Sequence, residues 1–163
     1  MKNNQLIPGE PLREGVDLIA DKKTGALIVV GTSAKLDKIS SGGINLYNCK
    51  FTPEMLCELA KMDGAIIVDQ NVDTILKANV HLNPSDLIET SQTGTRHRTA
   101  QRVSVETELN VIAVSDESGI IKVFSNNEVN ELEESSMILG RVNESLQSID
   151  RTRRRFDLSL IHI

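Results

Sequence analysis

Aromatic residues are nearly absent from this chain of 163 residues: they make up 2% of it, and Trp does not occur. A core without large rings has to be built from Ile, Leu, Val and Ala. Proteins that bind single-stranded nucleic acid stack bases on exposed aromatic rings beside basic residues. The low aromatic content therefore argues against that class of binding protein.

Positive charge is also scarce, because 18 basic residues stand against 23 acidic ones and the formal net charge is −5. Affinity for phosphate backbones comes from clustered Lys and Arg, so any anion site in this chain must be local. No apolar run approaches the ~20 residues of a membrane span, and the polar segment 1–10 lacks the apolar core of a signal peptide. These features predict a soluble, cytoplasmic protein without a membrane contact.

Several standard motifs are missing too. Cys49 and Cys57 fit no CxxC or zinc-binding spacing, which predicts reduced thiols in a cytosolic protein. The chain has no Walker-type phosphate loop, no GxGxxG fingerprint, no GxSxG elbow and no HExxH sequence. Common nucleotide, hydrolase and zinc-protease sites are therefore excluded.

Apolar patterning predicts an α/β fold, with a single domain built on a central mixed β-sheet flanked by helices and followed by a long C-terminal helix. Short continuous apolar runs indicate strands that are buried on both faces. The last two expected strands form a hairpin, and the third returns antiparallel to the second. We expect strands at 25–31, 64–69, 74–80, 111–115 and 120–124, and helices at 11–20, at 53–62 and after Gly94-Thr95.

The C-terminal part has a different pattern. Apolar residues from Val129 to Ile149 recur at helical spacing and predict one long helix over 128–156. We therefore expect a globular domain over 1–125 and a linker helix over 126–163 that is cut short, since its last residues carry no capping signal. The arginines at 151 and 153–155 lie among carboxylates, which favours a solvated helix face over a contact with DNA.

The densest functional signal is Thr93-Gly-Thr-Arg-His-Arg-Thr99. Gly94 lets the backbone approach a ligand, a helix that begins here offers free N–H groups, and the arginine forks match phosphate oxygens. Repulsion from the flanking arginines should lower the pKa of His97 and favour a neutral ring until an anion binds. The segment predicts a local phosphate site, and the alternative is a solvated basic helix end.

Two further segments could carry chemistry. Asp63 precedes Gly64 and a buried strand, where a carboxylate can hold Mg²⁺ or Mn²⁺ beside a triphosphate and Gly64 leaves room for a ligand. The residues from Ser115 to Gly119 follow a strand end, where ligands bind in such sheets. Each pattern also occurs in ordinary turns, which is the favoured interpretation of Gly42-Gly43.

Four motifs together resemble one family in their order and spacing: Asp63-Gly-Ala65, Asn79-Val-His-Leu82, Gly94-Thr-Arg-His-Arg98 and Val114-Ser-Asp-Glu117. The chain resembles the diadenylate cyclase domain over about residues 8–157, most closely the class found in bacterial DNA integrity scanning proteins. The resemblance implies an enzyme that condenses two ATP into cyclic di-AMP and releases two pyrophosphates. It also implies a homo-oligomer in which two domains meet face to face, each with one ATP, and which reaches an octamer in this class.

The same resemblance suggests roles for individual residues. Asp63 would bind Mg²⁺ or Mn²⁺ and help to activate the ribose 3′-hydroxyl, which attacks the α-phosphate held by the other protomer. The expected phosphate ligands are Thr95, Arg96, His97 and Arg98, and the other expected ATP contacts are Gly64, Leu82, Thr99, Ser115 and Glu117. DNA binding in this class belongs to a C-terminal domain that these residues do not include. The alternative to an enzyme is a non-catalytic nucleotide-binding or scaffold fragment.

Overall fold

The computed structural model describes residues 3–161, so the expectations for the two ends lie partly outside the described residues. By its contacts the chain divides into two units, Met1–Leu132 and Glu133–Ile163. The first unit contains a β-sheet and its helices, and the second is a single helix.

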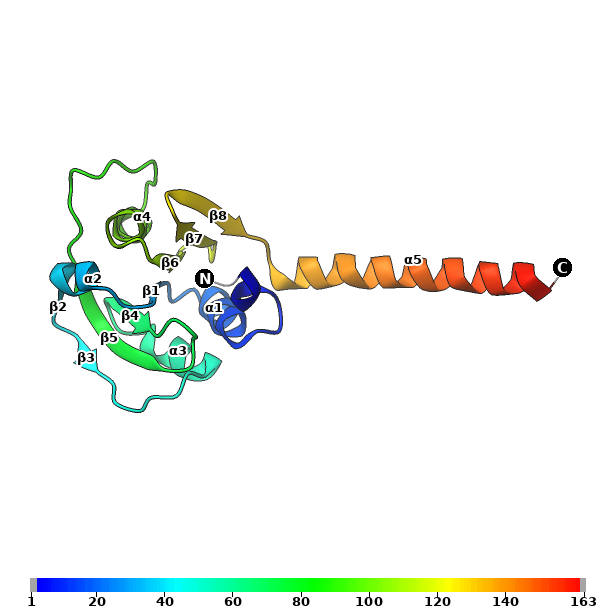
Figure 1. Cartoon of the computed structure of the whole chain (residues 1–163), viewed down its shortest axis with the longest axis horizontal. Coiled ribbons are helices and arrows are strands. Elements are labelled where there is room, and N and C mark those ends of the chain that lie inside the picture. The colour runs from blue at the N-terminus through cyan, green and yellow to red at the C-terminus, as the bar shows by residue number, and fades with distance from the viewer. Residues whose placement is uncertain (1–2, 162–163) are drawn as a thin grey trace. The chain divides into compact units, whose positions relative to one another are not determined.

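A mixed sheet of eight strands is the centre of the first unit (Figure 1). The strand order is β2-β5-β4-β1-β6-β7-β8, and β3 pairs with β5. Among the described residues β1 and β4 run parallel, and every other strand pair is antiparallel. The strands are β1 (Ala26–Val30), β2 (Ser40–Ser41), β3 (Ile44–Asn45), β4 (Ala65–Val68), β5 (Ile75–Leu82), β6 (Asn110–Val114), β7 (Ile121–Ser125) and β8 (Glu128–Leu132). The predicted mixed sheet is confirmed.

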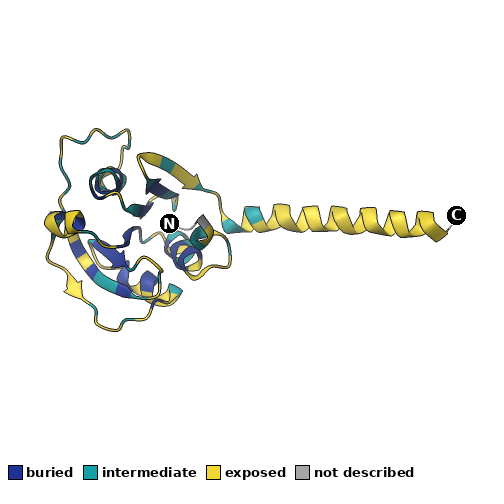
Figure 2. Ribbon diagram, viewed as in Figure 1, coloured by how far each residue is buried: buried dark blue, intermediate teal, exposed yellow. Residues whose placement is uncertain are grey.

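Helices cover both faces of this sheet. After a short 3₁₀ turn, η1 (Asn3–Leu6), the helices α1 (Pro11–Lys22) and α3 (Pro53–Leu59) pack on one face, while α2 (Ala34–Ile39) and α4 (Thr95–Thr107) pack on the other. Every residue of β1 is buried, as are most residues of the strands beside it (Figure 2). Alternate side chains of β1 lie in the two cores. Burial on both faces explains why the central strands appear in the sequence as continuous apolar runs.

Local signals account for where the helices begin. The Thr52 hydroxyl accepts a hydrogen bond from the backbone N–H of Met55 at 3.1 Å, and Pro53 occupies the first helical position of α3. This helix ends at Leu59, earlier than the predicted 62. The helix α2 was not predicted, although Ser33 caps it by accepting from the backbone N–H of Leu36.

The predicted helix over 128–156 is wrong at its start, because residues 128–132 form β8. Asn126 and Asn127 both have positive φ angles, 47° and 66°, which is the backbone of a two-residue type I′ hairpin turn. This turn pairs β8 with β7, so that Val129 lies opposite Phe124. Val129 and Leu132 are three residues apart, which is a spacing typical of one face of a helix. In a strand the same two residues point to opposite faces, and in β8 both of them are half-buried.

The second unit is the helix α5 (Ser135–Ile161), which buries none of its described residues. Its apolar stripe, including Leu146 and Ile149, is exposed within this unit. Arg154 pairs with Asp150 at 3.0 Å and so belongs to an exposed intrahelical ion pair. No helix within residues 3–161 is long and apolar enough to cross a membrane.

Candidate functional site

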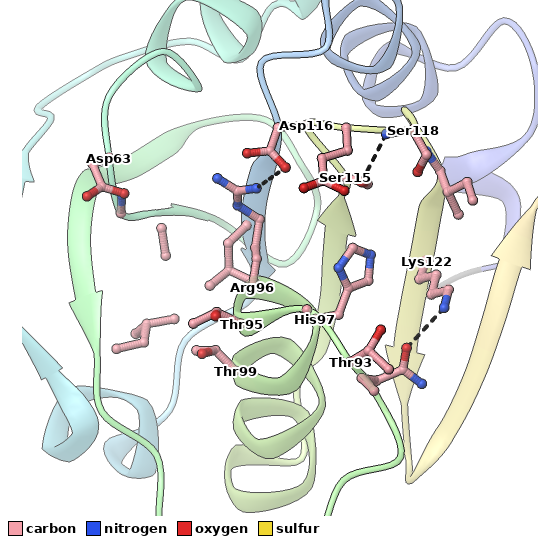
Figure 3. A pocket seen from close by; sticks show the side chains of 18 of the residues that line it. Asp63, Thr93, Thr95, Arg96, His97, Thr99, Ser115, Asp116, Ser118 and Lys122 are labelled. Atoms are coloured by element: carbon pink, nitrogen blue, oxygen red, sulfur yellow. Dashed lines mark hydrogen bonds and ion pairs between the residues drawn. The ribbon is translucent and has the colours of Figure 1, made fainter.

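A cavity of about 870 Å³ lies in the first unit where several chain segments converge (Figure 3). They are the start of β4, the end of β5, the beginning of α4, the turn between β6 and β7, and β7 itself. The lining residues are Leu27, 63–65, 80–82, 92–97, Thr99, 115–118, Ile120 and Lys122. The antiparallel return of β5 beside β4 places His81 and Leu82 next to Asp63, and the β6–β7 turn closes the other side.

The cavity brings together all the predicted site residues except Arg98. They are Asp63, Gly64, Leu82, Thr95, Arg96, His97, Thr99, Ser115 and Glu117. Arg98 is exposed beside the cavity, and its guanidinium makes no hydrogen bond or ion pair with any described residue. Its predicted contact with phosphate is therefore not supported by the lining of this cavity.

The first turn of α4 faces the cavity. Gly94 occupies the N-cap position with an extended backbone and offers no side-chain cap. The first N–H groups of an α-helix have no partner inside the helix, and the helix dipole adds partial positive charge at this end. Thr95 and Thr99 line the same wall with their hydroxyl groups. This end of α4 is therefore suited to bind phosphate oxygens.

The basic residues that line the cavity differ from the three arginines of the segment 93–102 that the sequence suggested. Arg102 points away from the cavity and holds the preceding loop, because it bonds the carboxylate of Asp86 and the backbone oxygen of Ile88, both at 3.0 Å. With Arg98 also outside the lining, Arg96 is the one arginine of the predicted group that lines the cavity. The second lining cation is Lys122 on β7, which the sequence analysis did not assign.

Arg96 lies against the β6–β7 turn, where its Nη1 is 3.5 Å from Oδ1 of Asp116. Gly25, directly before the start of β1, leaves room for this ion pair. A Cβ at Gly25 would lie 2.6 Å from Nη1 of Arg96 and 3.0 Å from Cβ of Asp116. The sequence identified Gly25 only as the boundary of a strand, and the structure shows that its missing side chain makes room for the ion pair.

Asp63 and Gly64 directly precede β4 at the cavity rim. The Asp63 carboxylate is exposed, and its Oδ1 accepts the N–H of Gly64 at 3.1 Å. Gly64 has φ 107°, and a Cβ there would lie 2.8 Å from the backbone carbon of Asn79 on β5. The close approach of β5 therefore requires glycine at this position, in addition to the room for a ligand that the sequence suggested.

The residues present fit a divalent cation bound together with a triphosphate. No cluster of three or more His, Cys, Asp or Glu side chains that could hold a metal occurs among the described residues. Mg²⁺ keeps several waters and is bound through one or two carboxylates plus substrate phosphates, without a complete protein cage. The exposed carboxylate of Asp63 shares the cavity with the first turn of α4 and is a ligand of the type that such a cation takes.

Ser115 lies in the turn between β6 and β7 and also lines the cavity, which are the two positions that its sequence context suggested. Its Oγ accepts the backbone N–H of Ser118 at 3.2 Å and so stabilises the turn between β6 and β7. The hydroxyl keeps its own proton for donation, because a serine both donates and accepts. Ser115 and Glu117 also line the cavity. A turn residue can therefore bind a ligand here.

The pKa of His97 is lowered, as predicted, but mainly for another reason. Partial burial of the ring is the largest cause, and the positive charges of Lys122 and Arg96 lower the pKa further, while Asp116 raises it. Repulsion by Arg98 is not among these causes. The ring packs edgewise on Phe124, with centroids 6.4 Å apart.

We expect the ring of His97 to titrate below the ordinary value of 6.5 and to be neutral at pH 7. An anion bound between Arg96 and Lys122 stabilises the protonated ring, so saturating pyrophosphate should raise its pKa. NMR titration of the ring proton signals with and without pyrophosphate measures both effects. A pKa of 6.5 or higher in the free protein would contradict this expectation.

A family model described as "DisA bacterial checkpoint controller nucleotide-binding", of the DAC type, matches residues 13–129. A DNA integrity scanning protein DisA of Kineococcus radiotolerans is 47% identical over 152 residues, which are 93% of this chain and 42% of that protein. DisA of Clostridium tetani is 43% identical over 148 residues, or 91% of this chain and 41% of that protein. The chain thus spans about two fifths of the length of these relatives.

Solved structures agree with this assignment. DacA from Staphylococcus aureus, as a double mutant, superposes with a TM-score of 0.61 at 27% identity, covering 80% of this chain and 89% of that one. A hypothetical membrane spanning protein from Bacillus cereus gives a TM-score of 0.65 at 25% identity, covering 76% and 62% of the two chains. With the family model matching most of the first unit, the chain belongs to the DisA nucleotide-binding family of diadenylate cyclase domains.

Proposed function

We propose that this protein is a diadenylate cyclase, which condenses two ATP molecules into cyclic di-AMP and two pyrophosphates. The observation that carries the proposal is one cavity that combines the exposed carboxylate of Asp63 with the uncapped end of α4 and Arg96. These groups match the two needs of the reaction, which are activation of a hydroxyl group and charge stabilisation at a phosphate. Membership of the family supports the same reaction.

In this proposal different residues of the cavity bind different parts of ATP. Gly64 and the backbone at Leu82 lie near the ribose and adenine. Thr95, Arg96 and His97 orient the phosphates through N–H, hydroxyl, guanidinium and imidazole donors, and Thr99, Ser115 and Glu117 complete the nucleotide site. Catalysis of phosphoryl-type transfer rests on such positioning and charge stabilisation.

Asp63 would hold Mg²⁺ or Mn²⁺ at the phosphates, and the ion would neutralise negative charge on them. Its carboxylate would also accept the proton of the ribose 3′-hydroxyl. The cavity of one protomer has one uncapped helix end and one carboxylate at the start of β4, while Asp116 and Glu117 lie in the β6–β7 turn. We therefore propose that two protomers meet face to face in a homo-oligomer, and that Arg98, exposed beside the cavity, contacts the ATP of the second protomer.

Incubation of the purified protein with ATP and Mn²⁺ tests the proposal, with cyclic di-AMP and pyrophosphate measured by chromatography. Product must form, and the rate per protomer must fall on dilution below the dissociation constant of the assembly. ATP binding without product at any protein concentration would favour the alternative, a non-catalytic nucleotide-binding or scaffold module. A rate per protomer that stays constant down to demonstrated monomer would overturn the shared site.

A DNA-binding role is not part of the proposal for these residues. The basic segment of α5 contains an intrahelical pair between Arg154 and Asp150 and a second contact between Arg153 and Asp157 at 4.0 Å. These pairs leave less positive charge for a phosphate backbone. The DNA integrity scanning named for the relatives concerns proteins more than twice this length, and cytoplasmic location stays a prediction.

Asp116→Asn should tighten ATP binding. The substitution breaks the exposed pair with Arg96 and removes a negative charge beside the phosphate site, so the guanidinium becomes available to the ligand. Exposed ion pairs contribute ~0–1 kcal/mol, which corresponds to a dissociation constant lowered by up to about 5-fold. Calorimetry with ATP measures this. Asp86→Asn breaks the ion pair with Arg102 outside the cavity and is the matched control. The prediction would be contradicted if both variants bound ATP with the same affinity.

A further inference from the structure

Lys122 on β7 faces the cavity, although it lies in a strand of apolar residues. Ile121 and Val123 pack into the core on the side of α1 and α3, whereas Phe124 packs into the core on the side of α4. Because strand side chains alternate, Lys122 points to the same side as Phe124. The ring of His97 packs against Phe124, so the lysine lies beside the first turn of α4 (Figure 3).

The ammonium group of Lys122 has a neutral partner. Its Nζ donates to Oε1 of Gln92 at 3.0 Å, and within residues 3–161 it forms no ion pair. Glu131 is the cross-strand partner of Lys122 on β8, yet the two side chains form no salt bridge. A lysine has three N–H donors, and the single amide contact leaves capacity for an anion. Arg96 and Arg102, by contrast, each pair with a carboxylate.

Lys122 and Asp63 lie at opposite ends of the cavity. Strand β4, which follows Asp63, and strand β7 are separated by β1 and β6 in the sheet. Three strand spacings correspond to about 14 Å. Figure 3 shows Asp63 on one side, Lys122 on the other, and the first turn of α4 between them. The cavity therefore has a carboxylate end, a central helix terminus and an ammonium end.

We infer that Lys122 binds the terminal two phosphates of ATP, which leave as pyrophosphate, and that Gln92 positions its ammonium group. The inference rests on the proposed function, in which the ribose lies near Gly64, beside Asp63, and the first turn of α4 orients the phosphates. The triphosphate then continues towards β7. Lysine is a compact point charge that binds phosphate without the fixed geometry of arginine.

Lys122 would stabilise the negative charge that develops on the leaving pyrophosphate during the reaction. The 3′-oxygen of one ribose forms a bond to the α-phosphorus of the other ATP, and its proton passes to the carboxylate of Asp63. The bond between the α-phosphorus and the bridging oxygen breaks, and its electron pair leaves on the pyrophosphate. Lys122 stabilises that negative charge, which is greater in the transition state than in bound ATP.

Lys122→Gln tests the inference through its effect on the affinity for pyrophosphate, the leaving group of the reaction. Calorimetry should show pyrophosphate bound about 10-fold or more weakly than by the unsubstituted protein, because a charge-assisted hydrogen bond is lost, while the affinity for AMP stays the same. Lys122→Arg should retain most of the affinity for pyrophosphate. Lys77→Gln, a half-buried strand lysine on β5 outside the cavity, is the matched control and should change neither affinity.

Kinetics separates this inference from the proposed function. In Lys122→Gln, the KM for ATP and the inhibition constant of pyrophosphate should both rise about 10-fold, and kcat should fall as well. Cyclic di-AMP synthesis with unchanged pyrophosphate inhibition would overturn the role of Lys122 and leave the proposed function intact. An equal loss of AMP and pyrophosphate affinity would also overturn it, since it would indicate a general disturbance of the cavity.

A measurement on the unsubstituted protein covers the case in which Lys122→Gln does not fold. The side-chain NMR signals of Lys122 should shift on addition of pyrophosphate and stay in place on addition of AMP. Signals of Lys77 should move with neither ligand. Pyrophosphate that binds without shifting the signals of Lys122 would overturn the inference.

Discussion

Asp63→Asn should lower the rate of cyclic di-AMP synthesis about 10²- to 10⁴-fold, the range for loss of a general base. The substitution removes the negative charge at the carboxylate end of the cavity, together with the proposed ligand for Mg²⁺ or Mn²⁺. The fold should persist, because Asp63 is exposed and its carboxylate oxygen accepts the N–H of Gly64, a hydrogen bond that an amide oxygen can also accept. Product formation and thermal unfolding measure the two effects.

The control for this variant is Glu58→Gln. Glu58 is an exposed carboxylate on α3 outside the cavity, and its contact is an ion pair with Lys61 at 2.6 Å. The same loss of charge at this distant position should leave the rate unchanged. Retention of most of the activity in Asp63→Asn would contradict the catalytic role of the carboxylate. An equal loss in the control would point to a general effect of charge.

Gly64→Ala should destabilise the first unit by about 3 kcal/mol and lower its melting temperature by about 10 °C. The new Cβ would lie 2.8 Å from the backbone carbon of Asn79 and 3.0 Å from its Cα, and backbone atoms of a central strand cannot move aside easily. The φ angle of 107° is also unfavourable for alanine. Activity should fall too, because Asp63 directly precedes the displaced residue.

Gly9→Ala separates the two causes. Gly9 has a similar φ of 97°, and a Cβ there would meet no atom within 4 Å. It should therefore cost only the backbone strain, about 1–2 kcal/mol. Scanning calorimetry of both variants gives the contribution of the β5 contact by difference. Equal losses of stability would show that packing against Asn79 contributes nothing.

Strands that the sheet buries on both faces were the easiest elements to predict. The runs at 25–31 and 64–69 contain only apolar residues between their glycines or their acidic ends, so their burial does not depend on which face is considered. The start of α3 was equally clear, because Thr52 and Pro53 act within one turn. Signals of this kind depend on neighbours in the sequence and remain readable without the fold.

The start of the C-terminal helix was not predictable from apolar spacing. Val129 and Leu132 fit a helical repeat, but they belong to a strand that pairs with β7. The evidence against a helix was the Asn126-Asn127 turn, which requires left-handed backbone at both residues. Hydrogen bonding to an existing edge strand decided the outcome, and helical propensity was the weaker influence.

Most of the candidate site was predictable because its residue types carry the chemistry. A Gly-Thr-Arg segment at a helix start indicates a phosphate site on chemical grounds. An acidic residue before a buried strand suits a metal ligand but also occurs in ordinary turns, and the resemblance to the family favoured the ligand. The directions of individual side chains were not predictable. Arg98 and Arg102 have the same charge as Arg96, yet only Arg96 reaches the cavity, because successive helix positions point in different directions.

The amino-acid sequence by itself determined the α/β class, the central strands and the family, and it indicated two groups of the candidate site, Asp63 and the start of α4. The tertiary structure decided which cations the site contains. Lys122 and Arg96 are 26 positions apart, and only the pairing of β6 with β7 and the packing of α4 on the sheet bring them to one cavity. The physical reason is that charges act through distance in space, which the order of residues along a chain does not specify.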